Sequence, residues 1–250
     1  HTISLVVTGV QTCALPIFNL RPETRDVRLF MHQAFIIGDS GSSTDTVQVL
    51  PDDNAVIHYR GRRVFAASGQ VDDGKFFDQY AVGVFGREGR EGTYRDADDG
   101  ELSNSTAEHG RVDSTIRFKL ELAGHGSARV NYWLAAGTSL REVLYIHKNI
   151  ISQTIHKRFE ATAKWWRLWL RPAKKVAQRI KPEYRQAFIN STMLLKAHID
   201  KRGAVIASSD GEALNYQRDA YAYCWPRDSV YILWPLVRSE ERRVGKECRS

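Results

Sequence analysis

The first part of the chain alternates apolar and polar residues with a period of two. The clearest run covers residues 115–122, where Ile116, Phe118, Leu120 and Leu122 share one face. Such alternation is typical of a half-buried antiparallel strand. Many short strands at regular spacing predict a β-sandwich whose two inner faces form the core. Turns rich in Gly, Asp and Asn separate further runs of this kind at residues 27–37, 55–60, 64–67, 77–85 and 130–135.

The periodicity changes near residue 138 and is helical from Ser152 onward. Apolar residues recur every three or four positions between residues 159 and 170, and Pro172 ends that run. A second helix is expected from Pro182 to residue 199, because proline suits the first turn of a helix. A third apolar segment, at residues 230–236, follows Asp228. We therefore expect a β-sandwich at residues 19–150, a helical linker at 151–181 and the start of an all-α unit at 182–237.

Composition places the chain among ordinary globular proteins. Of its 250 residues 42% are hydrophobic and 26% are charged, which excludes disordered and collagen-like classes. The net charge of +7 is a mild excess, and with no basic stripe apparent we expect no nucleic-acid partner. No apolar run reaches the roughly 18 residues of a membrane span, so we expect no membrane association. The sequence gives no indication of compartment, and the cytoplasm is taken as the default.

No metal or cofactor site is indicated. The three cysteines lie far apart, without the spacing of zinc ligands or of a disulfide framework. Residues 96–100 are acidic but lack a complete set of calcium ligands, so we expect an exposed turn there. Histidines are scattered along the chain, and each is expected on the surface of a strand, loop or helix: His32, His58, His109, His125, His147, His156 and His198.

Both ends of the chain have an unusual composition. Residues 7–17 resemble the in-frame translation of a common short-read sequencing adapter, and residues 238–250 resemble the translation of its partner adapter. We therefore expect residues 1–18 and 238–250 to be adapter-derived, which would leave Cys224 as the only cysteine of the remainder. The alternative is an N-terminal strand at residues 3–18 and a charged helix end at 238–250.

The densest group of aromatic and charged residues lies at 215–228. Arg227 and Asp228 are adjacent, and together they offer a donor fork and an acceptor pair that can hold neighbouring hydroxyls of a sugar. Trp225 and Tyr221 could supply apolar faces for the ring. A structural alternative is that Asp228 caps the next helix, Arg227 neutralises it and Trp225 fills the core. Residues 225–228 taken alone favour this alternative.

The wider context favours the sugar-binding interpretation. Residues 203–228 closely resemble the start of the catalytic domain of glycoside hydrolase family 15, the glucoamylase-type enzymes of bacteria and archaea. Residues 24–30 and 77–81 resemble the N-terminal sandwich of that family. The resemblance implies an all-β super-sandwich followed by the first helices of an (α/α)6 barrel. It also implies that Tyr221 and Trp225 line the subsite for the terminal glucose, and that Arg227 and Asp228 bind its outer hydroxyls.

The implied reaction is the removal of glucose, with inversion, from the non-reducing ends of α-linked glucose oligosaccharides or polysaccharides, as in a glucan 1,4-α-glucosidase. It needs two carboxyl groups, one to protonate the leaving oxygen and one to activate water. In the family both are glutamates downstream of the position of Asp228, so we expect them beyond the end of this chain and the chain itself to be inactive. A trehalose-cleaving member of the family and a non-catalytic carbohydrate-binding or interaction module are the alternatives. No cofactor is implied, and the oligomeric state is left open.

Overall fold

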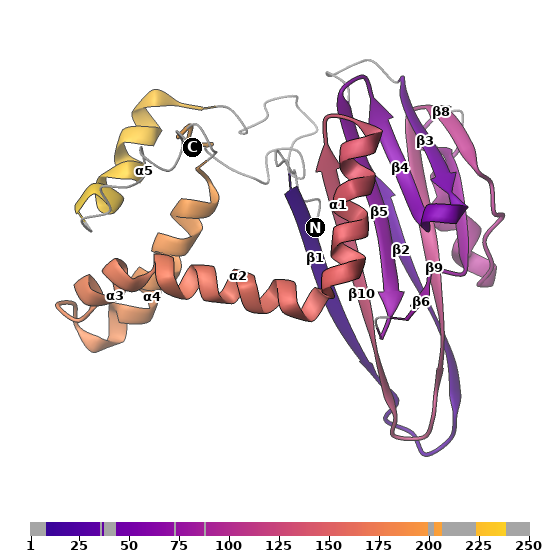
Figure 1. Cartoon of the computed structure of the whole chain (residues 1–250), viewed down its shortest axis with the longest axis horizontal. Coiled ribbons are helices and arrows are strands. Elements are labelled where there is room, and N and C mark those ends of the chain that lie inside the picture. The colour runs from indigo at the N-terminus through magenta and orange to yellow at the C-terminus, as the bar shows by residue number, and fades with distance from the viewer. Residues whose placement is uncertain are drawn as a thin grey trace. The chain divides into compact units, whose positions relative to one another are not determined.

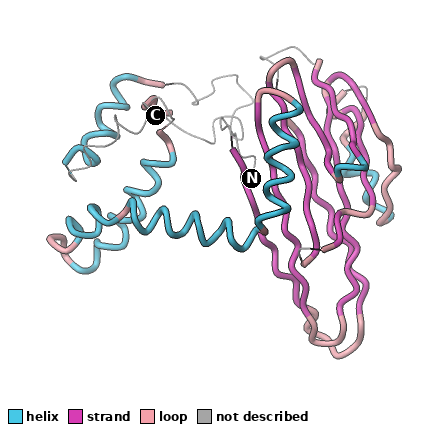
Figure 2. Tube along the Cα trace, viewed as in Figure 1, coloured by secondary structure: helices cyan, strands magenta, loops and turns pink. Residues whose placement is uncertain are grey.

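A computed structural model of the chain describes residues 9–35, 37, 44–72, 74–87, 89–199, 203–206 and 224–238. The chain divides into two compact units. The sandwich unit is Val7–Arg158, and the helical unit comprises Phe159–Ser250 with His1–Val6. Most of the first unit consists of strands, with a long helix beside them, and the described elements of the second unit are helices (Figure 2). The predicted fold class, a β-sandwich followed by helices, is confirmed.

Two antiparallel sheets form the sandwich unit (Figure 1). The small sheet has the order β2 (Arg25–Ala34), β9 (Val112–Leu122) and β7 (Gln79–Val84). The large sheet has the order β1 (Gly9–Phe18), β10 (Ser127–Gly137), β5 (Arg63–Val71), β4 (Ala55–Arg60), β3 (Asp45–Leu50) and β8 (Ala107–Gly110), with β6 (Lys75–Phe76) paired to β5. Short 3-10 helices occupy η1 (Pro51–Asp53) and η2 (Thr93–Asp99).

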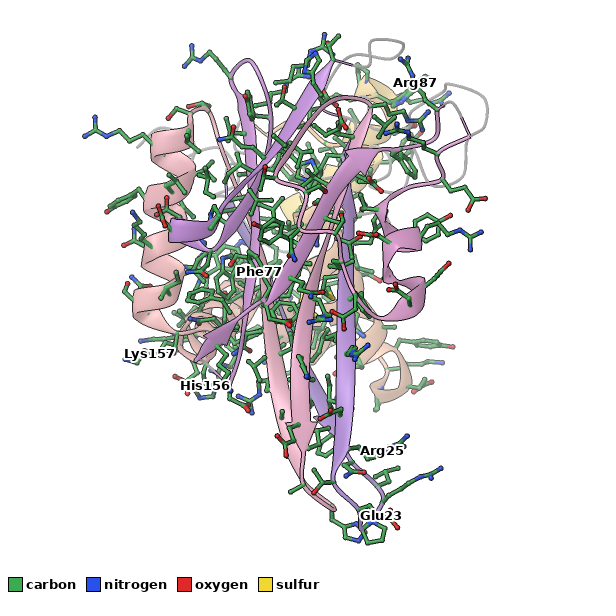
Figure 3. The ribbon with its side chains drawn as sticks, turned by 90° about the vertical axis from the view of Figure 1, so that its right-hand side faces the viewer. Glu23, Arg25, Phe77, Arg87, His156 and Lys157 are labelled. Atoms are coloured by element: carbon green, nitrogen blue, oxygen red, sulfur yellow. The ribbon has the colours of Figure 1, made fainter. Side chains whose placement is uncertain are left out.

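The main core lies between the sheets, as the alternation predicts. Ile116, Phe118 and Leu120 of β9 point inward and are almost fully buried. They pack in one cluster with Val47 and Val56 of the large sheet. Phe77 belongs to the same cluster and is labelled near the middle of the sandwich unit in Figure 3. The two inner faces therefore supply the core in the manner expected of a sandwich.

The other face of β9 departs from the expected solvent exposure. Thr115 and Arg117 should be exposed by alternation, yet both are buried. The Thr115 hydroxyl is 2.9 Å from the Thr93 hydroxyl at the start of η2. The guanidinium of Arg117 pairs with Asp78 and with Glu101, 2.8 Å away, and donates to the carbonyl of Gly100. The segment around η2 therefore covers the central strand on its outer side.

A helix forms a third layer that the sequence pattern does not predict. Helix α1 (Leu140–Gln153) begins about twelve residues before the expected helical region. Ser139 caps it, because its side chain accepts a hydrogen bond from the backbone N–H of Glu142. Val143 and Ile150 face the large sheet and pack with Trp133 in a second buried cluster. The sandwich unit thus includes a helix within what we expected to be purely β.

The narrow end of the sandwich is held by polar contacts of one side chain. Asn19 is buried, and its amide donates to the carbonyls of Glu23, Leu122 and Ala123. Glu23 and Arg25 mark this end of the sandwich in Figure 3. A Cβ atom on Gly124 would lie 1.7 Å from the carbonyl oxygen of Pro22. Position 124 therefore requires glycine, because the turn passes close to the backbone at Pro22 of the same chain.

The N-terminal segment forms the edge strand β1, and a strand at 3–18 was one of the two alternatives for this region. All ten residues of β1 pair antiparallel with β10. Pro16 is tolerated because proline, which has no N–H, is accommodated on edge strands. The presence of a strand does not distinguish an adapter-derived segment from a native one, because residues such as Val, Thr and Ile favour strands in either case. The strands β3, β6 and β8 were not predicted.

Four further helices follow α1 in the described chain, and the first of them begins within the sandwich unit. They are α2 (Ile155–Trp169), α3 (Arg171–Ala177), α4 (Pro182–Ala197) and α5 (Pro226–Arg238). Pro172 lies in the first turn of α3, so the helical run does end before it and a new helix begins. Pro182 starts α4 as expected. The helix predicted after Asp228 instead begins at Pro226, which brings Arg227 and Asp228 into its first turn.

Candidate functional site

The candidate site lies at the start of α5. The carbonyl of Trp225 accepts hydrogen bonds from the backbone N–H of Ser229, at 2.9 Å, and from its hydroxyl, at 2.8 Å. These bonds close the first helical turn immediately after Trp225. Cys224, directly before this turn, forms an isolated antiparallel bridge with Ile206. The indole of Trp225 is 47% exposed, so the alternative in which it fills the core is wrong.

Arg227 and Asp228 form a pair on the exposed side of this turn. The Nε atom of Arg227 lies 3.3 Å from Oδ1 of Asp228, and their side chains are 83% and 40% exposed. Asp228 is the third residue of α5 and not the residue before it, so the expected cap by Asp228 is not seen; an acidic residue in the first turn still interacts favourably with the helix dipole. This contact leaves two guanidinium nitrogens and one carboxylate oxygen unused among the described residues. The pair therefore presents donors and an acceptor side by side, an arrangement that suits adjacent sugar hydroxyls.

Tyr221, the fourth expected site residue, lies outside the described residues. The structure thus brings together Trp225, Arg227 and Asp228 in one helical turn, as their adjacency in sequence implies, and leaves Tyr221 untested. The sequence analysis did not assign an exposed stripe that continues from Arg227 along α5. Val230, Tyr231 and Trp234 are 61%, 75% and 59% exposed and lie at helical spacing from Arg227. A search for i, i+3, i+4 and i+7 positions after the motif could have found this stripe.

A second polar cluster lies inside the sandwich and contains a histidine and a serine. The Nε2 atom of His58 is 2.7 Å from the hydroxyl of Ser114, and that hydroxyl donates to Oε1 of Gln33 at 2.8 Å. The hydroxyl proton is therefore directed to Gln33, so the ring must donate through Nε2. Burial, with a smaller contribution from His32, lowers the pKa of His58 to about 3. His58 is thus a neutral structural residue that joins the two sheets.

His147 is likewise buried, and the expectation that His58 and His147 lie on the surface is wrong. The indole N–H of Trp133 donates to Nδ1 of His147 at 3.1 Å, so Nε2 carries the proton and donates to the carbonyl of Asp53 at 2.8 Å. Burial lowers the pKa of His147 below its usual value. The two ring nitrogens of His147 thus connect α1 to strand β10 and to η1. Their partners are distant in sequence, which explains why pattern analysis missed them.

The described residues contain no group of three or more His, Cys, Asp or Glu side chains that could hold a metal ion. The acidic residues at 96–100 are used locally. Asp96 accepts a hydrogen bond from the backbone N–H of Ser103, and Asp99 accepts one from that of Glu101. In the part of the chain that the structure describes, no helix is both long and apolar enough to cross a membrane.

Comparison with known proteins finds similarity among solved structures. No family model and no curated protein match the sequence. Among solved structures, the chain is similar to a bacterial glucoamylase that was crystallised with acarbose, with a TM-score of 0.64 and 16% sequence identity. The similarity covers 88% of this chain and 32% of the glucoamylase chain, so this sequence spans about a third of that protein. At this identity the similarity establishes a shared fold, a β-sandwich followed by helices as in that glucoamylase.

Proposed function

We propose that this chain is the N-terminal part of a glucoamylase-type hydrolase that removes glucose from the non-reducing ends of α-linked glucose oligosaccharides or polysaccharides. The observation that carries the proposal is the exposed Arg227–Asp228 pair beside an exposed Trp225, on a chain with the fold of a glucoamylase. The motif that contains them resembles the family's sugar-binding turn. Charged hydrogen-bonding groups next to an aromatic ring are the features that a sugar site needs.

In the proposed reaction these residues bind and orient the terminal glucose. Asp228 would accept hydrogen bonds from sugar hydroxyls, Arg227 would donate to their oxygens, and Trp225 and Tyr221 would cover an apolar face of the ring. Inverting hydrolysis needs a carboxylic acid that protonates the glycosidic oxygen and a carboxylate that takes a proton from the attacking water. We propose that both are glutamates in a later part of the complete protein.

The test compares ligand binding by two variants that each lose one negative charge. Asp228→Asn should weaken binding of acarbose about 10-fold or more, because hydrogen bonds to charged groups contribute about 1.5–3 kcal/mol. Glu183→Gln, an exposed change in α4, is the control and should bind as the unmodified chain does. Titration calorimetry measures both affinities. Equal affinities for the two variants would return Asp228 to a purely structural role.

A second assay addresses catalysis. We expect the 250-residue chain to release no glucose from maltose or maltotriose, because we place the two catalytic carboxyl groups elsewhere in the protein. Measurable turnover would contradict that placement. Binding of acarbose without any turnover, even by a complete protein, would instead support a non-catalytic carbohydrate-binding module.

The terminal segments form a separate proposal. We propose that residues 1–18 and 238–250 are translated from sequencing adapters, on the basis of their resemblance to adapter sequence at both ends. Resequencing the source DNA tests this directly. A native reading frame that continues unchanged through either segment would refute it.

A further inference from the structure

The positive charge of the chain is concentrated in one stretch of helices. Residues 155–199, which we call the basic helical segment, contain eleven Lys and Arg residues against two acidic residues, Glu160 and Glu183. Since the net charge of the whole chain is only +7, the remainder of the chain carries no positive excess. The average over the full sequence hides this concentration, which the search for a basic stripe overlooked.

These basic side chains are available for an external partner. Nine of the eleven are exposed: Lys157, Lys164, Arg167, Arg171, Lys174, Lys175, Arg179, Lys181 and Arg185. Lys157 lies near the start of α2 (Figure 3). Among the described residues, none of the eleven forms an ion pair with a carboxylate. Where such side chains make contacts, they are to backbone carbonyls, as for Arg167 and Arg185, or to a ring, as for Lys196 over Trp169. The charge is therefore not neutralised within the described structure.

Apolar and aromatic side chains accompany this charge on α2. Phe159, Trp166 and Trp169 lie on one side of the helix by spacing, and Lys157 and Lys164 lie on the opposite side. Phe159 and Trp165 are 43% and 45% exposed. A helix with lysines on one side and Trp and Phe on the other is typical of segments that lie in the plane of a membrane interface.

The ring geometry favours a lipid surface over a nucleic-acid strand. Trp165 and Trp169 are stacked on each other, Trp166 meets both edge-on, and the ammonium of Lys196 lies 5.8 Å from the centroid of Trp169. The face of Trp169 is thus already engaged, whereas single-strand binding uses open aromatic faces on which bases stack. The charges also spread over three helices, which suits a broad surface.

We propose that the basic helical segment binds the surface of a bilayer that contains anionic phospholipids. The lysine and arginine side chains lie against the headgroup phosphates, and the exposed rings of Phe159 and Trp165 enter the boundary with the acyl chains. This association is peripheral, and it differs from our sequence-based expectation of no membrane partner. It does not depend on the proposed hydrolase function, because it uses neither Arg227 nor Asp228.

The test is sedimentation of the 250-residue chain with vesicles of phosphatidylcholine that either contain or lack phosphatidylglycerol. We expect binding to the anionic vesicles that weakens as salt is added, with a blue shift of tryptophan emission. The variant Lys174→Glu/Lys175→Glu should lower the partition coefficient about 20-fold or more, because each basic residue near such a surface contributes about fivefold. Both lysines are exposed, and circular dichroism verifies that the variant keeps its helices.

The matched control makes the same charge change on the sandwich unit. Lys119→Glu/Arg129→Glu alters two exposed residues of β9 and β10 and should leave vesicle binding nearly unchanged. Equal losses in the two double variants would overturn the proposal, because the effect would then reflect net charge alone. Equal binding to neutral and anionic vesicles, or binding of a labelled single-stranded oligonucleotide with no preference for anionic vesicles, would also overturn it.

Discussion

The sandwich unit and the helical unit differ in how far they bury their own side chains. Strand β9 buries every residue from Val112 to Phe118, on both of its faces. Among the described residues of the helical unit, α4 buries only Thr192. The one buried residue of α2, Ile155, lies in the first turn of that helix, which belongs to the sandwich unit. A strand needs a partner strand for its backbone hydrogen bonds, whereas a helix satisfies them within itself. A helix can therefore form while its apolar side still faces solvent. A strand forms only together with a neighbouring strand, so the side chains of both are buried at the same time.

The largest expected effect tests this difference in burial directly. Phe118→Ala removes a fully buried ring between the sheets and should lower the free energy of unfolding by about 3–5 kcal/mol. Leu168→Ala, at a side chain of α2 that is 46% exposed, should change it by no more than about 0.5 kcal/mol. Urea denaturation followed by circular dichroism measures both. Similar losses at the two positions would show that the helical unit is packed as tightly as the sandwich.

An intermediate effect concerns acid stability of the sandwich unit. Folded His58 takes up a proton only near pH 3, whereas the unfolded chain does so below the usual pKa of 6.5. The unfolded state therefore binds more protons between these values, and stability falls as the pH drops from 6.5. Between pH 6.5 and 5 we expect a loss of about 2 kcal/mol, at about 1.4 kcal/mol per pH unit. His147, whose pKa is also lowered, adds a loss of the same sign.

The variant His58→Gln separates this effect from general acid denaturation. Its side chain can still donate to Ser114 but does not titrate, so the slope of stability against pH above 5 should decrease by the His58 contribution. Urea denaturation at both pH values measures the slopes of the variant and the unmodified chain. Identical slopes would mean that His58 does not titrate as burial dictates.

The smallest expected effect concerns packing within the helical unit itself. Trp165→Leu removes one ring from the cluster of Trp165, Trp166 and Trp169 and should destabilise this unit by about 1 kcal/mol, the usual size of aromatic pair interactions. Tyr184→Leu, at an exposed ring of α4 without a described ring contact, is the control and should have little effect. Thermal unfolding followed by far-UV circular dichroism measures both. A larger loss for Tyr184→Leu would show that α4 uses its exposed face in folding.

Local patterns predicted the elements better than the contacts between them. Alternation located β4 at its observed bounds and β9 within three residues, because the inward side chains of both meet the opposite sheet. Alternation wrongly predicts that Thr115 and Arg117 are exposed. Both are buried by the segment around η2, whose sequence pattern is typical of a loop. Alternation also failed for α1, whose inward residues pack on a sheet formed by strands far away in sequence.

The candidate site shows a similar limit. The sequence predicted a helix after Asp228 and placed Trp225, Arg227 and Asp228 together, because adjacent residues in a turn stay close in any fold. It did not predict that α5 begins at Pro226, nor that Trp225 is exposed. The buried His58 and His147 were missed because their partners, Ser114 and Asp53, lie 56 and 94 positions away. Contacts across such separations depend on sheet order, which a single sequence does not encode in its local pattern.

The distribution of tryptophan gives the chain an optical consequence. The sandwich unit has a single indole, Trp133, which is fully buried. The other five of the six tryptophans belong to the helical unit, where Trp165, Trp225 and Trp234 are 45%, 47% and 59% exposed. An indole shielded from water emits at shorter wavelength than one in contact with it. The blue and red edges of the intrinsic fluorescence therefore report on different units. Unfolding of the two parts can be followed separately in one unlabelled sample.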